Sequence, residues 1–283
     1  MNIAVLAVVR FCLRGAIIIG VFLTIVISFQ EALVFPSVLR GLQHEKGPRS
    51  AAIGESVEVL TVPTIDGTFV EGVRVAPEGH TRGFALVFHG NGDTLDSSRG
   101  LRNWLRQLGF AAFSLEYRGA GRSRGWPSER LLEQDSLALW ELMCARQECD
   151  PARTLIFGYS MGSGPASFVA HKVDPRGLLL MAPFTSLRDM VAEIPLYRHL
   201  LPFLRIQFPV IDRVRTLRST QVLVLHGERD TVVPVTHAKR FAEEYAGSSH
   251  VAVAIHPLAN HVDILSHQHD LAKRWIEDHF PYR

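Results

Sequence analysis

The sequence has 283 residues, of which 47% are hydrophobic and 20% charged, as expected of a chain that buries one large core. Its 30 basic and 28 acidic side chains leave a net charge of +2, which removes any strong case for nucleic acid as a partner. The chain contains no repeat period and no low-complexity tract, so a repeat architecture is not indicated.

An apolar segment opens the chain. Residues 15–29 form an unbroken apolar or weakly polar stretch that follows Arg10 and Arg14, and its extension to Phe35 reaches membrane-spanning length. No clear small-x-small cleavage site follows the stretch, so we expect residues 1–35 to be an uncleaved, single-pass membrane anchor. A cleaved signal peptide and a helix packed on the folded domain are the alternatives.

Residues 36–54 are expected to be a linker because glycine, proline, serine and charged residues concentrate there, and residues 55–283 are expected to form the catalytic domain. Basic residues lie on both sides of the apolar segment, and those before it favour a folded domain outside the cytoplasm. Cys144 and Cys149 lie near each other at the end of a predicted helix, where a disulfide is possible but not required.

Strands and helices alternate through the rest of the chain. Val57–Thr61 and Thr68–Val75 are predicted to pair as an antiparallel hairpin. Five further strands are predicted, at residues 84–88, 153–157, a run ending at Met181, 221–227 and 251–256. Helices are predicted at residues 97–108, 129–146, 161–172, 237–245 and 264–279. This alternation predicts an α/β fold whose central sheet is mostly parallel and carries helices on both faces.

An insertion at about residues 184–218 separates the strand ending at Met181 from the next one. It is rich in apolar residues, and Pro195, Pro202 and Pro209 interrupt any long helix in it. One interpretation is a short apolar cap over a site, suited to an acyl chain or to contact with a bilayer surface. The other is a simple cover for the edge of the sheet.

The motif G-Y-S-M-G occupies residues 158–162, directly after a predicted buried strand and before a predicted helix. This is the form of a nucleophile elbow, in which the serine lies on a strained turn with its hydroxyl exposed. Glycine is needed at positions 158 and 162, because a side chain there would collide as the backbone folds around the serine. Ser160 is therefore the candidate nucleophile, and Tyr159 is a candidate substrate-binding residue.

A serine nucleophile needs a base and an acid that orients the base. Asp230 and His261 follow the last two predicted strands, in the chain order serine, acid, histidine that such elbows require. A carboxylate at position 230 would hold the imidazole tautomer and stabilise the imidazolium, although Asp230 could instead cap the next helix. His256 lies inside a strand and His267 and His269 inside a helix, so position favours His261 as the general base.

The loop after the strand at residues 84–88 reads His89-Gly90-Asn91-Gly92. An oxyanion hole combines the backbone N–H after the nucleophile with another from such a loop, so Met161 and Asn91 are the candidate donors. His89 and Gly90 are candidate substrate-binding residues. No zinc-ligand spacing and no complete G-x-G-x-x-G accompanies these residues, so neither a metal nor another cofactor is expected.

Arg118, Arg122 and Arg124 gather in one glycine-rich loop. We interpret this cluster as part of a solvated loop. A site for an anionic substrate group or a phospholipid head group is the alternative.

Together these motifs resemble the alpha/beta hydrolase fold over roughly residues 55 to 283. The matching segments are His89-Gly90-Asn91-Gly92, residues 117–123, the Ser160 elbow, residues 182–186, residues 226–230 and Asn260-His261. Within that fold the chain is most similar to the membrane-anchored alpha/beta hydrolase domain-containing proteins and their bacterial relatives, which are related to the catalytic domain of prolyl oligopeptidases. This resemblance implies that Ser160, Asp230 and His261 form a catalytic triad.

The expected chemistry is acyl transfer. Attack by Ser160 on an acyl carbon gives an acyl-enzyme that water then cleaves. Esters and thioesters need the least help with the leaving group, so we expect a serine hydrolase acting on a small-molecule ester or lipid-like substrate near a membrane. A serine peptidase or amidase of the prolyl oligopeptidase type is one alternative, and a catalytically silent, membrane-tethered binding module is the other.

Overall fold

One eight-stranded sheet organises the computed structural model, which describes residues 10, 11, 13–15, 17, 18, 20, 21, 24, 27–35, 57–195 and 198–282. The strands are β1 (Val57–Val62), β2 (Val70–Val75), β3 (Gly83–Phe88), β4 (Phe110–Leu115), β5 (Thr154–Tyr159), β6 (Gly177–Met181), β7 (Gln221–Gly227) and β8 (Val251–His256). They lie in the order β1-β2-β4-β3-β5-β6-β7-β8. The hairpin β1–β2 and the pair β2–β4 are antiparallel, and the other neighbours are parallel, which confirms the predicted sheet.

Strand β4 was not singled out from the sequence. Its six residues are all buried, so it shows no alternation of polar and apolar side chains. Two central alanines also weaken its β-propensity. Its place in the sheet comes from tertiary pairing, because β2 and β3 flank it on either side.

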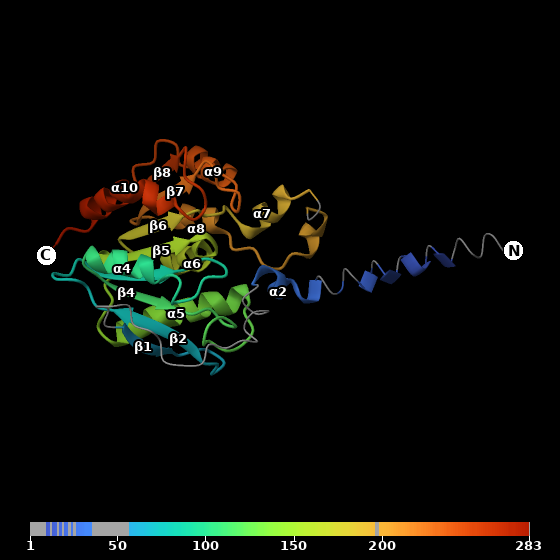
Figure 1. Ribbon diagram of the computed structural model, residues 1–283, viewed down its shortest axis with the longest axis horizontal. Helices are drawn as coiled ribbons and strands as arrows, with labels where there is room; N and C mark the ends of the chain where they lie inside the picture. The colour runs from blue at the N-terminus through green and yellow to red at the C-terminus, as the bar shows by residue number, and fades with distance from the viewer. Residues whose placement is uncertain are drawn as a thin grey trace.

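Helices cover both faces of the sheet, as predicted (Figure 1). One buried hydrophobic cluster lies under α5 (Glu129–Ala145), α6 (Ser163–Val173), α8 (Val210–Thr216) and α9 (Thr236–Glu244). A second cluster lies under α4 (Arg99–Gln107) and α10 (Ile264–His279). Because parallel strands end at one edge of the sheet, the loops after β3, β5, β7 and β8 meet there.

The insertion between β6 and β7 consists of short pieces, as its prolines predicted. It contains α7 (Leu187–Glu193), the 3-10 helix η3 (Arg198–Phe203) and α8, and none of its described helices exceeds seven residues. In Figure 1, α7 projects from one end of the molecule while α8 returns to lie beside α6. Phe208 of the insertion packs closely against α6. A Cβ on Gly164 of this helix would lie only 2.4 Å from the Phe208 ring.

The apolar N-terminal segment is described in part. It includes the short helix α2 (Gln30–Val34), and several earlier side chains, among them Phe11, Ile17 and Ile18, are more than half exposed. Among the described residues, the structure contains no helix with the length and hydropathy needed to cross a bilayer. Much of the predicted anchor and all of the predicted linker, residues 36–54, lie outside the described residues.

Arg118 differs from both interpretations of the arginine cluster, whereas Arg124 is exposed, as expected of a solvated loop. Arg118 is buried, with 1% of its side chain exposed, and it is neither solvated nor open to a ligand. Its guanidinium donates to Asp135 at 2.5 Å (Nε to Oδ2) and to Asp66 at 2.6 Å (Nη1 to Oδ2). These bonds tie the loop after β4 to α5 and to the β1–β2 hairpin. Ionic groups this far from solvent need such pairing to be tolerated.

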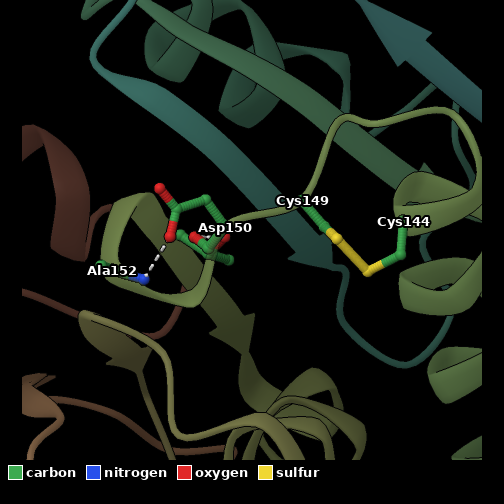
Figure 2. Close-up of a disulfide and its surroundings, with 5 residues drawn as sticks. Cys144, Cys149, Asp150 and Ala152 are labelled. Atoms are coloured by element: carbon green, nitrogen blue, oxygen red, sulfur yellow. Dashed lines mark hydrogen bonds between the residues drawn. A yellow bond between two sulfur atoms is a disulfide. The ribbon is translucent and has the colours of Figure 1, made fainter.

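A disulfide joins Cys144 and Cys149, the pair for which a bridge was possible. Figure 2 shows it between the last turn of α5 and the loop that leads to Asp150 and Ala152. The Asp150 carboxylate accepts from the Ala152 N–H at 3.0 Å and so caps the 3-10 turn η1 (Pro151–Arg153). The disulfide and this cap therefore hold the two ends of the short connection between α5 and β5 in place.

We predict that Asp135→Ala lowers the free energy of unfolding by about 3–5 kcal/mol, because it leaves the buried Arg118 charge without its buried partner. Urea unfolding followed by circular dichroism measures this. The control is Asp66→Ala, which removes the other carboxylate on the same guanidinium. Asp66 is 43% exposed, so solvent screens its pair and its loss should be much smaller. Equal losses in the two variants would contradict the importance of the buried pair.

Candidate active site

Ser160 lies on a sharp turn between β5 and α6. Its φ of 53° is in the left-handed region that a residue other than glycine rarely adopts, which confirms the strained turn. A Cβ on Gly162 would lie 2.1 Å from the Phe88 carbonyl oxygen, and one on Gly158 would lie 2.7 Å from the Ala166 Cβ. The need for glycine at both positions is thereby confirmed.

The structure brings Ser160, His261 and Asp230 together. His261 Nε2 lies 3.1 Å from Ser160 Oγ, and His261 Nδ1 lies 2.7 Å from Asp230 Oδ2. Both distances are within the reach that proton transfer from a nucleophile to an oriented base requires. Ser160 is only 8% exposed, so the residue is buried and does not lie on a projecting loop.

Three hydrogen bonds hold the Asp230 carboxylate in place, one with the histidine and two with the backbone. Its Oδ1 accepts from the Val232 and Val233 N–H groups, both at 2.8 Å, and its Oδ2 faces His261. Burial acts to raise the pKa of Asp230, but the hydrogen bonds from His261 and from the backbone outweigh it, so the pKa lies below its usual value. Helix α9 begins without a side-chain cap, so the alternative of Asp230 as a helix cap is not what the structure contains.

An ionised Asp230 can only accept, so the proton of a neutral His261 resides on Nδ1. The lone pair on Nε2 is then left facing the Ser160 hydroxyl. This is the tautomer that a general base for serine needs. The carboxylate therefore fixes both the orientation and the protonation pattern of the ring.

His226 is a neighbour of the site that sequence reasoning missed. Its fully buried ring donates from Nε2 to the Val233 carbonyl at 3.0 Å, and Nε2 lies 3.5 Å from Asp230 Oδ2. Burial lowers its pKa, which keeps the ring neutral near pH 7. The only signal in the sequence was its place at the end of the strand before Asp230. The ring braces the turn at residues 230–233 from below.

Tyr159 contacts the histidine loop. Its hydroxyl donates to the His261 carbonyl at 3.1 Å, and the two rings lie 5.3 Å apart. Burial raises the pKa of Tyr159 to about 12, so the hydroxyl keeps its proton throughout the neutral range. The elbow is thus tied to the loop of the base. A direct role for Tyr159 in binding substrate stays a prediction.

The loop after β3 lies beside the elbow. A Cβ on Gly90 would lie 3.1 Å from the Tyr159 ring, which shows how closely the loop packs on the residue before the nucleophile. Asn91 follows on the exposed tip of the loop, and Met161 is buried next to Ser160. The roles of the Asn91 and Met161 N–H groups as oxyanion donors, and of Gly90 in binding substrate, stay predictions.

His89 is the first residue of this loop. Its ring is fully buried, 4.1 Å from the Tyr117 ring, with Nε2 at 3.4 Å from Glu116 Oε1. The Tyr117 hydroxyl also donates to the His89 carbonyl at 2.8 Å. The ring therefore supports the loop from inside, and a role for His89 in binding substrate stays a prediction.

Known proteins share this fold. The family model described as "Serine aminopeptidase, S33" matches residues 79–219. A solved alpha-beta hydrolase from Vibrio vulnificus superposes with a TM-score of 0.71 at 20% identity, covering 88% of this chain and 92% of that one. The Pyrococcus furiosus esterase Pf2001 gives a TM-score of 0.64 at 17% identity, covering 83% and 100%. The chain therefore has the alpha/beta hydrolase fold, and these matches support a serine hydrolase of that fold.

Several curated proteins are similar to the chain in sequence. An uncharacterised Mycobacterium tuberculosis protein is 35% identical over 55% of each chain. The lysophosphatidylserine lipase ABHD12 of Danio rerio is 32% identical over 58% of this chain and 47% of its own. The alpha/beta hydrolase domain-containing protein WAV2 of Arabidopsis thaliana is 28% identical over 88% and 86%. The match thus spans about half the length of the first two relatives.

The pKa of Asp230 leads to a prediction about acid stability. Because this pKa is lower in the folded protein, the ionised carboxylate contributes stability that is fully present above about pH 5 and is lost as the pH falls through the folded-state value. We expect the free energy of unfolding of the wild type to fall more steeply in acid than that of Asp230→Asn, measured by urea unfolding at a series of pH values. Parallel pH profiles would contradict this assignment.

Proposed function

We propose that the protein cleaves carboxylic esters or thioesters through an acyl-enzyme. Ser160 attacks the acyl carbon, and His261 takes its proton and passes it to the leaving group. Asp230 stabilises the imidazolium, and the N–H groups of Met161 and Asn91 hold the oxyanion. Water then repeats the sequence on the acyl-enzyme. The observation that supports this proposal best is the continuous hydrogen-bonded line from Asp230 through His261 to Ser160.

We infer further that the acyl group is lipid-like. The loops that carry Asp230 and His261 also expose apolar side chains, with Val232 57%, Leu258 52% and Val262 81% exposed. In the insertion at the same edge of the sheet, Phe203 is 47% exposed. Apolar surface beside a catalytic serine favours a long acyl chain over a polar substrate. The likeness to a lysophosphatidylserine lipase points to the same class.

We also propose that residues 1–35 hold the enzyme at a membrane through their apolar stretch, while their end, residues 27–35, packs on the catalytic domain. Residues 36–54 would be a linker and 55–283 the catalytic domain. The apolar stretch at residues 15–29 supports this division, as do the exposed apolar side chains described within it. The catalytic domain would lie outside the cytoplasm, where disulfides such as Cys144–Cys149 persist.

The catalytic proposal is tested with p-nitrophenyl esters of increasing acyl length. We expect turnover that rises with chain length and falls roughly 10⁴-fold or more in Ser160→Ala. A fluorophosphonate probe should label the wild type and not the variant. Turnover that persists in folded Ser160→Ala would overturn the mechanism.

The second candidate is a serine peptidase, which the description of the matching family model favours. Cleavage of an amide requires His261 to protonate the leaving nitrogen. Aminoacyl p-nitroanilides, assayed beside the esters, separate the two functions. Hydrolysis of the anilides at a rate equal to or above that of the esters would favour the peptidase. Labelling without turnover of either class would leave a substrate outside both.

The proposed location outside the cytoplasm is tested through the redox state of Cys144 and Cys149. We expect Cys144 and Cys149 to resist alkylation in protein taken from its native cells without reductant, and to react after reduction. Mass spectrometry of the peptides reads this directly. Rapid alkylation of both thiols before reduction would contradict a location outside the cytoplasm.

A further inference from the structure

The α2 segment, residues 27–35, contacts the loop after β3, which itself packs on the elbow. In Figure 1, α2 lies at the end of the domain from which α7 of the insertion projects. Its contacts fall on two regions far away in the sequence, namely the insertion and the loop after β3. Neither the triad nor its proposed mechanism makes use of this segment.

Polar contacts hold the α2 segment on the insertion. The side chain of Gln30 is buried, and its Oε1 accepts from the Arg205 backbone N–H at 2.8 Å. The Arg205 guanidinium donates in return to the Ile27 carbonyl at 2.6 Å and lies 3.9 Å from the Glu31 carboxylate. These contacts join side chain to backbone in both directions, so they specify one docked position.

An aromatic side chain anchors the end of the segment. Phe35 is 2% exposed and meets the edge of Phe208 with the ring centroids 6.4 Å apart. Phe208 in turn packs on Gly164, four residues after the nucleophile. The segment is therefore part of the same hydrophobic cluster as α6 and does not lie loosely on the surface.

Between these anchors the segment holds Asn91. The Asn91 side-chain amide donates to the Val34 carbonyl at 2.6 Å. Asn91 lies between Gly90 and Gly92, and Gly92 has a φ of 95°. Two flanking glycines give this backbone a freedom that other residues would not. A bond from the far end of the Asn91 side chain to a docked segment restricts that freedom.

We propose that the α2 segment is a positioning element of the active site, which holds the loop after β3, residues 89–93, in place through the bond from Asn91 to Val34. The inference rests on the proposed function, in which the Asn91 N–H is an oxyanion donor. Such donors act because they are fixed before charge develops, and a small misplacement weakens them steeply. The rate of the chemical step then depends on a segment that precedes the sheet by more than twenty residues.

The test undocks the segment in the full-length protein with Gln30→Ala/Arg205→Ala. The matched control, Arg188→Ala/Gln207→Ala, removes the same residue types from the insertion. Its Arg188 bonds to the Leu201 carbonyl within the insertion and not to α2. Hydrogen exchange of the peptide spanning residues 89–93 measures the loop, and p-nitrophenyl ester kinetics measures the chemistry.

We expect undocking to speed exchange at residues 89–93 and to lower kcat about tenfold with little change in KM. This loss is smaller than the 10²–10³ expected for removal of an oxyanion donor. Asn91→Ala should give a similar loss, and its combination with the undocking pair should add little, because both act through one bond. The control should change neither exchange nor kcat.

Unchanged exchange and kcat in the undocked variant would overturn the inference, as would equal losses in the control. The exchange measurement does not need activity. If wild type and Ser160→Ala hydrolyse no ester, the proposed function fails, while faster exchange in the undocked variant would still support the restraint on the loop.

Discussion

The geometry of the site depends on the turn at Ser160, which is strained and leaves no space around it. The backbone at Gly162 passes so close to the end of β3 that any side chain would strike the Phe88 carbonyl. The residues after Phe88 form the loop that is proposed to hold the oxyanion, so the same contact that permits the turn also sets the elbow and this loop side by side. The strain at Ser160 persists because packing on all sides determines it.

Bonds between side chains and backbone then link the loops that meet at this turn. Tyr159 holds the carbonyl of His261, His226 holds the carbonyl of Val233, and Tyr117 holds the carbonyl of His89. Each of these donors is largely or wholly buried, which makes its bond costly to leave unmade. The loops that carry the candidate catalytic residues are thus held in place by hydrogen bonds from these side chains to their backbone.

The sequence predicted the features that have a local pattern, and it missed those that depend on contacts with distant segments. The elbow, Asp230 and His261 were located because each follows a recognisable strand. Strand β4 was missed because its pairing, and not its pattern, makes it a strand. Arg118 was misjudged because loops rich in glycine suggest exposure, whereas its guanidinium is buried and paired with Asp135 and Asp66 from distant segments. The docking of α2 had no local signal at all.

The disulfide influences more than the end of α5. It closes the turn that carries Glu148, whose carboxylate accepts from Arg74 of β2 at 2.8 Å. The turn thereby braces the hairpin whose outer strand, β1, forms one edge of the sheet. An edge strand released from its supports is where chains pair with one another and aggregate. The solubility of the protein therefore depends on the redox state of the compartment in which the disulfide forms.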